Sequence, residues 1–180
     1  MPKARLPKIL AFVVLCGASS NAFAQKVEGS VVCVITENRG PASGMMVLQQ
    51  AGKAPTKVAC GSAVIVSAGL YTATLSLDGA LDKPEQRKSV EVKAANTEKV
   101  IADFSTGVLQ VQAEAQGKRA AAMATITKDG RKIASLGTGV AAHLSTGTYD
   151  VVIRYRGKEK RFDGVNIVPG QRQVLSADFE

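Results

Sequence analysis

The sequence predicts an all-β fold: two tandem, small antiparallel β-sandwich domains that follow an N-terminal signal peptide. The chain repeats itself at an offset of 78 residues, and its short segments alternate apolar and polar residues with the period of a strand. After residue 24 no stretch carries a sustained apolar stripe with the 3.6-residue period of a helix. About seven short strands in each half, separated by turn residues, are typical of small β-sandwiches.

Residues 1–24 have the three-part layout of a secretory signal peptide. A basic start is followed by an apolar run at 9–16 and by small residues ending in "AFA", which predicts a cut after Ala24. The apolar run is shorter than the roughly 20 residues of a membrane span. Leu15 before Cys16 disfavours a lipidated cysteine, because that processing resembles a pattern with a small residue there. We therefore expect a periplasmic or secreted protein without an integral membrane span.

Charge and cysteine content change when this segment is removed. Three of the 23 Lys and Arg residues lie in it, which leaves 20 against 15 Asp and Glu and lowers the net charge from +8 to +5. Two cysteines remain, Cys33 and Cys60. In an oxidising compartment we expect them to form one disulfide; the alternative is two small buried residues that do not meet.

The internal repeat defines the organisation of the mature chain. At an offset of 78 residues, Gly29–Gly79 and Gly107–Gly157 share ten identical positions, five of them glycine, which indicates shared backbone bends. The offset falls to 75 by the tripeptide ADF, at 102–104 and 177–179, so a hairpin loop after Gly79 differs in length by three residues. The predicted boundary near 105–107 gives domains 25–105 and 106–180.

The strand predictions follow from local patterns. In the first copy, runs separated by Gly, Pro, Asn or Lys predict strands at 30–36, 45–53, 62–66, 70–79, 89–93 and 99–104. In the second copy, segment 107–115 alternates apolar and polar residues, and the turn "KDG" within 123–134 predicts a hairpin. Segment 149–155 places apolar residues at alternate positions and polar ones mostly between them, which predicts a further strand.

A G-x-Y element recurs in both copies, as Gly69 with Tyr71 and Gly147 with Tyr149. Glycine accepts a backbone bend before the strand, and the Tyr buries its ring while its hydroxyl reaches a backbone group at the sheet corner. With the turn "VNIVPGQ" at 165–171, this element resembles carboxypeptidase-regulatory-like and PEGA-like domains, which are transthyretin-like, Ig-like β-sandwiches of bacterial surface proteins. The first copy has "VKAANT" in place of that turn. The resemblance implies a sandwich fold and an accessory, non-catalytic role.

The residues that carry chemistry are sparse. His143 is the single histidine and aligns with apolar Ile65 in the repeat, so we expect it to be structural or superficial. Metal-ligand spacings, phosphate-binding loops and hydrolase motifs are missing from the sequence. We expect no enzyme activity, no cofactor and no metal site, and nucleic acid is not an expected partner of an exported chain.

A basic hairpin distinguishes the second copy, whose net charge is +4 against +1 for the first. It carries Arg154, Arg156, Lys158, Lys160 and Arg161 around a turn at Gly157. Because Arg154 and Arg156 are two residues apart on an expected strand, they should share one face. We expect a protein-interaction or scaffold role in the bacterial envelope, with the hairpin steering an acidic partner. Alternatives are binding of an anionic lipid head group or polysaccharide, and simple protection of a strand edge.

Overall fold

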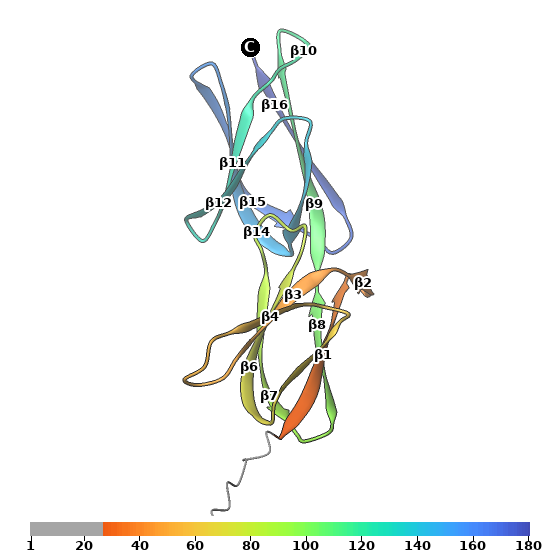
Figure 1. The fold of residues 1–180 in the computed structure, drawn as a ribbon. Coiled ribbons are helices and arrows are strands. Elements are labelled where there is room, and N and C mark those ends of the chain that lie inside the picture. Colours follow the sequence, from red (N-terminus) through yellow and green to blue (C-terminus); the bar gives the residue numbers. More distant parts are fainter. Residues whose placement is uncertain (1–26) are drawn as a thin grey trace, which may run out of the picture.

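A computed structural model describes residues 27–180, so the predicted signal peptide and its cut after Ala24 lie outside the described residues (Figure 1). Residues 27–180 form strands and turns with no helix, which confirms the predicted all-β fold. In Figure 1 two sandwich-like modules lie end to end. We call residues 28–104 the first module and residues 106–179 the second module.

Two sheets form the first module. Its strands are β1 (Glu28–Glu37), β2 (Gly40–Ala42), β3 (Gly44–Gln49), β4 (Thr56–Ala59), β5 (Ala63–Ser67), β6 (Gly69–Leu77), β7 (Glu85–Val92) and β8 (Thr97–Phe104). In one sheet β1 pairs with β2 and β5 on one side and with β8 on the other; the second sheet has the order β4-β3-β6-β7. Alternate residues of both sheets point inward, and Val31, Met46 and Leu75 are among those completely buried between them.

The second module repeats this topology around a core of its own. Its strands are β9 (Thr106–Ala115), β10 (Lys118–Arg119), β11 (Met123–Lys128), β12 (Arg131–Gly137), β13 (Ala141–Ser145), β14 (Gly147–Tyr155), β15 (Lys158–Ile167) and β16 (Arg172–Phe179). β9 pairs with β10, β13 and β16, and the second sheet has the order β12-β11-β14-β15. Leu109, Ile126 and Ile153 lie fully buried in this core.

One pairing in each module departs from the antiparallel arrangement. β1 pairs with β8, and β9 with β16, in parallel. The chain leaves β7 or β15 in one sheet and crosses to the other sheet, where it runs beside the module's first strand in the same direction. Because an alternating pattern is the same in parallel and antiparallel strands, the sequence could not distinguish them.

Side chains and backbone from both modules meet at a junction. The Asn38 side chain, in the turn after β1, donates from Nδ2 to the Thr106 carbonyl at 2.9 Å and accepts from the Thr106 amide at 3.0 Å. Thr106 is 1% exposed, and its hydroxyl donates to Glu37. Its buried polar groups are therefore satisfied by the first module.

The loop 78–84 between β6 and β7 forms the other half of the junction. The Leu81 amide donates to the carbonyl of His143 at 2.9 Å. Asp82 accepts from the Ser145 amide at 3.0 Å and from the Tyr149 hydroxyl at 2.9 Å. The corresponding turn of the second module is only Arg156–Gly157. The extra residues of the first copy, predicted as a tolerated loop, thus make contacts with the second module.

Candidate functional site

The basic hairpin divides its charges between faces of the sheet. β14 ends at Tyr155, and Arg156 and Gly157 occupy the turn with φ of +46° and +82°. This two-residue turn with both φ positive is typical of tight hairpins. The expectation that Arg154 and Arg156 share a strand face is therefore wrong, because Arg156 lies in the turn after β14 and not on the strand.

Cross-strand pairing places the remaining basic residues. Arg154 lies opposite Glu159 on β15, and its Nε is 3.2 Å from the Glu159 carboxylate. Arg161 lies opposite Val152 and belongs to the same outer face. Lys158 and Lys160 lie opposite Tyr155 and Ile153, whose side chains point inward, so these two lysines share the inner face of an edge strand. The hairpin thus does not form one continuous patch.

Two of the five basic residues join a hollow at the far end of the second module, which we call the distal groove. It has a volume of about 380 Å³ and is lined by Ala115, Gln116, Lys118, Arg119, Ala120, Tyr155, Arg156, Lys158, Phe179 and Glu180. The Tyr155 and Phe179 rings lie 5.6 Å apart in its floor. The Arg156 guanidinium lies 5.3 Å from the Tyr155 ring centre, and Lys158 donates to the Glu180 carbonyl.

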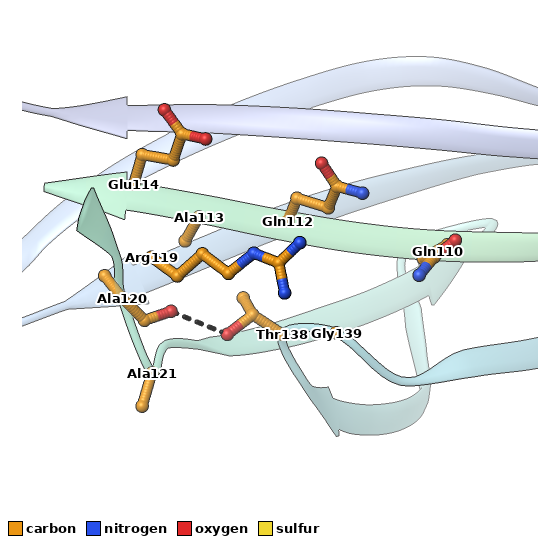
Figure 2. Close-up of a pocket in the computed structure, with 9 residues that line it drawn as sticks. All are labelled: Gln110, Gln112, Ala113, Glu114, Arg119, Ala120, Ala121, Thr138 and Gly139. Atoms are coloured by element: carbon orange, nitrogen blue, oxygen red, sulfur yellow. Dashed lines mark hydrogen bonds between the residues drawn. The ribbon is translucent and has the colours of Figure 1, made fainter. Parts of the chain in front are cut away.

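Lys118 and Arg119 also line the distal groove, and sequence reasoning missed them. With Arg156 and Lys158 they form what we call its basic rim. Lys118 and Arg119 lie on the short strand β10, nearly 40 residues from the hairpin, and only the fold brings them together. Arg119 also lines an adjoining hollow of about 370 Å³ (Figure 2). In Figure 2 its guanidinium group lies between Gln112 and Thr138.

The distal groove occupies the same end of its module as the junction does in the first. Ala115 and Gln116 are the repeat equivalents of Glu37 and Asn38, which contact Thr106. Gln116 and Asn38 both have positive φ, of +53° and +49°. In the first module this end is covered by the second module. In the second module the basic residues at this end, Lys118, Arg119, Arg156 and Lys158, are exposed.

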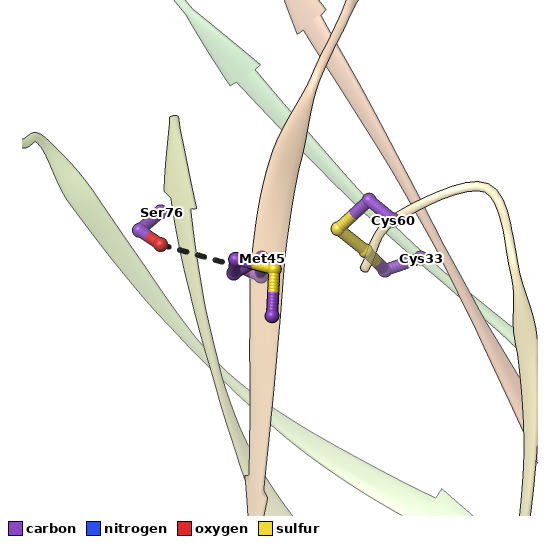
Figure 3. Close-up of a disulfide and its surroundings, with 4 residues drawn as sticks. All are labelled: Cys33, Met45, Cys60 and Ser76. Carbon is purple, nitrogen blue, oxygen red and sulfur yellow. Dashed lines mark hydrogen bonds between the residues drawn. A yellow bond between two sulfur atoms is a disulfide. The ribbon is translucent and has the colours of Figure 1, made fainter. Parts of the chain in front are cut away.

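The predicted disulfide is present. Cys33 on β1 is bonded to Cys60, which follows β4, with the Cα atoms 4.8 Å apart (Figure 3). The bond joins the two sheets of the first module, and Figure 3 shows it beside Met45 of β3, whose carbonyl accepts from Ser76. The alternative of two separate buried cysteines is excluded.

The two G-x-Y elements have the same local geometry. Gly69 and Gly147 have φ of +146° and +138°, values that glycine adopts most readily. The hydroxyls of Tyr71 and Tyr149 lie 2.8 and 2.9 Å from the carbonyls of the residues four positions earlier. Only Tyr149 also meets Asp82; its burial, followed by that hydrogen bond and the nearby negative charge, raises the pKa of the phenol.

His143 lies at the junction, 54% exposed, with Nδ1 3.5 Å from the Glu37 carboxylate. Within residues 27–180 no group of three or more His, Cys, Asp or Glu side chains is arranged to hold a metal ion. The same residues contain no helix with the length and hydropathy needed to cross a membrane.

No protein-family model matches the chain, and no curated protein sequence matches it. Among solved structures, the TIE protein of Bacillus anthracis is 13% identical, with a TM-score of 0.41 over 86% of this chain and 34% of that one. The minor pilin of Streptococcus agalactiae is 10% identical, with a TM-score of 0.43 over 84% of this chain and 94% of that one. A leucine-rich repeat protein of Bacteroides thetaiotaomicron is 12% identical, with a TM-score of 0.35 over 84% and 26%. The chain thus spans about a third or less of the TIE and leucine-rich repeat proteins. At these values the likeness assigns neither family nor activity.

Proposed function

We propose that the chain is an exported, non-catalytic interaction module of the bacterial envelope, in the periplasm or outside the cell. Its two domains, 25–105 and 106–180, act as a spacer whose distal groove binds an acidic region of a protein partner. The Cys33–Cys60 disulfide supports an oxidising compartment. The resemblance of the G-x-Y elements to carboxypeptidase-regulatory-like and PEGA-like domains supports an accessory role.

The repeat equivalence of the distal groove and the junction carries this proposal. In the first copy this end of the sandwich already holds a folded unit through Asn38 and Asp82. In the second copy the same end combines an aromatic floor, Tyr155 with Phe179, and a basic rim. Tyr and Arg are enriched among residues that dominate binding energy at protein interfaces, and a basic rim favours an acidic partner.

A second candidate function is binding of an anionic envelope component through the same rim. The observation that favours it is the gathering of four cationic side chains, those of Lys118, Arg119, Arg156 and Lys158, around one groove. Anionic lipid head groups and acidic polysaccharides are attracted to such clusters, and that attraction falls as salt concentration rises.

The test is affinity capture from an envelope fraction of the native source with the full mature chain. A triple variant, Lys118→Glu with Arg119→Glu and Arg156→Glu, should lose the captured proteins. A control with Lys53→Glu, Lys57→Glu and Lys93→Glu makes the same charge change on exposed residues of the first module and should retain them. Equal capture by all three proteins would reject the distal groove. Salt-sensitive binding to anionic vesicles or envelope polysaccharide, without captured protein, would favour the second candidate.

A further inference from the structure

We propose that the open edge of β16 accepts an extended, acidic segment of a partner protein as an added strand. The inference rests on the proposed interaction function and names the surface and the chemistry of the partner. β16 pairs with β9 on one side only, so its other side is a sheet edge. Such edges bind extended peptides through backbone hydrogen bonds.

The parallel pairing shows which backbone groups of β16 face that edge. The Val108 amide donates to the Gln171 carbonyl at 2.8 Å, which fixes the register of the ladder. In a parallel pair alternate residues bond to the neighbouring strand and those between them point away. Val174, Ser176 and Asp178 therefore direct their amide and carbonyl groups to the open side.

The equivalent edge in the first module is capped by side chains. The Ser30 amide donates to the Asn96 carbonyl, which fixes the register of β1 with β8. By the same argument, Ile101 and Asp103 of β8 direct their backbone amide and carbonyl groups to the open side. Lys88 Nζ donates to the Ile101 carbonyl, and Gln86 Nε2 donates to the Asp103 carbonyl at 2.5 Å. Both capping side chains come from β7, the edge strand of the facing sheet, so they occupy the space that an added strand would need.

The second module has other residues at both cap positions, Lys160 in place of Gln86 and Phe162 in place of Lys88. Lys88 lies opposite Ala73 on β6, and the equivalent residue opposite Val151 on β14 is Phe162, which packs against the core instead. The register shifts by one residue just after Phe162, where the Gly164 amide donates to Asp150 at 2.9 Å.

Lys158 of β15 donates to the carbonyl of Glu180, the residue that follows β16, but the outward carbonyls within the strand have no such donor in the described part of the chain. Within residues 27–180 no side chain donates to the carbonyl of Ser176 or Asp178. Val174 is 43% exposed on the same strand. The two modules therefore have the same edge in two states, one closed by its own side chains and one open.

The two lysines on the inner face of β15 favour an acidic strand at this edge. A groove of about 540 Å³ lies at the C-terminal end of the edge and is lined by Lys158, Glu159, Lys160, Asp178, Phe179 and Glu180. Its carboxylates Glu159 and Asp178 belong to the outer faces of their strands, and Glu180 follows β16. Lys158 and Lys160 share the inner face of β15, so an added strand would meet their ammonium groups with every second side chain. Carboxylates at those positions would pair with the lysines. An apolar strand would instead desolvate the lysine ammonium groups without a partner, and a basic strand would be repelled by them.

Amide hydrogen exchange with a defined probe tests the inference on the full mature chain. The probe is a ten-residue peptide that alternates Glu and Val; its controls replace Glu with Lys, or alternate Glu and Pro. At saturation the acidic strand peptide should slow exchange of the Val174 and Ser176 amides at least tenfold. The amides of Lys99 and Ile101 on the capped β8 edge should be unaffected. Unchanged exchange at β16, or equal protection by the Glu-Pro peptide, would overturn the inference. Protection that grows with protein concentration without peptide would identify a second copy as the occupant and also overturn it.

Proline variants separate this inference from the proposed function. Ser176→Pro removes an outward amide without breaking a bond to β9, and Ile101→Pro is the matched change on β8. Ser176→Pro should weaken peptide binding at least tenfold and reduce envelope capture, while Ile101→Pro should not. If Ser176→Pro captures envelope proteins normally and the Lys118, Arg119 and Arg156 triple variant does not, the proposed function stands and the added strand is rejected.

Discussion

Where the first module joins its sheets through Cys33 and Cys60, the second has Val111 and Thr138 at the equivalent positions. The surrounding backbone is the same in both. The Gly61 amide donates to the Cys33 carbonyl at 2.9 Å, and its equivalent donates to the Val111 carbonyl at 2.7 Å. The sandwich therefore closes at this corner through backbone hydrogen bonds, with or without a covalent link.

The hydroxyl of Thr138 replaces the missing sulfur with weaker bonds. It donates to the Ala120 carbonyl at 2.8 Å, as Figure 2 shows. It also accepts from the Ala122 amide at 3.1 Å. A hydrogen bond contributes about 1 kcal/mol, whereas a disulfide contributes about 2 to 4 kcal/mol, chiefly by restricting the unfolded chain. The same fold thus carries two levels of reinforcement, with the stronger in the module nearer the N-terminus.

Removing the covalent link should have the largest effect. Replacing Cys33 and Cys60 with Ala should lower the free energy of unfolding of the first module by about 3 kcal/mol, because the bridge spans a separation of 27 residues. The second module should be unaffected, since its core is separate. Exchange of buried amides in β3 and β11 reports the two modules individually. Equal loss in both would contradict this division into two cores.

Adding a disulfide to the second module should give it the same covalent reinforcement as the first module. Val111→Cys with Thr138→Cys should form a disulfide and raise the free energy of unfolding of the second module by about 2 kcal/mol, after the loss of the Thr138 hydrogen bonds. Mass spectrometry before and after reduction checks the bond, and thermal unfolding of oxidised and reduced forms measures the gain. A free thiol pair would show that the two corners differ in geometry as well as in side chains.

Loss of the Asp82 carboxylate should uncouple the modules. Asp82→Ala removes the acceptor of the Ser145 amide and the Tyr149 hydroxyl, and should weaken the junction by about 2 kcal/mol. Residual dipolar couplings should then require separate alignment tensors for the two modules, where one suffices in the parent. Asp78→Ala, an exposed change in the same loop, serves as the control and should leave a single tensor.

The smallest effect concerns pH. Burial and the Asp82 carboxylate raise the pKa of Tyr149 above the ordinary tyrosine value of about 10. The resulting stabilisation is present below about pH 10 and is lost as pH rises toward the folded pKa. At pH 10.5 the free energy of unfolding of the second module should be about 1 kcal/mol lower than at pH 8. The Tyr149→Phe variant should lose less over the same pH range. Parallel alkaline unfolding curves for the two proteins would contradict this coupling.

Much of the fold could be predicted because its signals are local. Alternation identified β9 and β14, and runs bounded by turn residues identified six strands of the first copy. The shared glycines and G-x-Y elements aligned the two copies, but β13 and β16 were not predicted as separate strands. The strands β2, β4 and β10 were missed because two to four residues, one of them Pro41, are too few to show a period. The parallel closing strands were missed because direction leaves no trace in the alternation.

The candidate site was less predictable. Arg156 and Lys158 were identified from charge alone, but Lys118 and Arg119 reach the same groove through tertiary structure. The bulge after Phe162 was hidden inside the three-residue difference between the copies, which combines a shorter turn with an inserted residue. The length change itself was visible in the sequence. It coincides with the loop 78–84, which contacts the second module, and with the bulge in β15.

The parallel closing strand has a consequence for how such a chain can evolve. Since the first and last strands of a module run the same way, the polypeptide enters at one pole and exits at the opposite pole. Copying the unit therefore lengthens the molecule along its axis, by roughly 30 Å for a ten-residue strand, without disturbing what the terminal unit displays. The length of the molecule can then be selected through the number of copies. Its binding specificity can be selected independently through the surface of the last module.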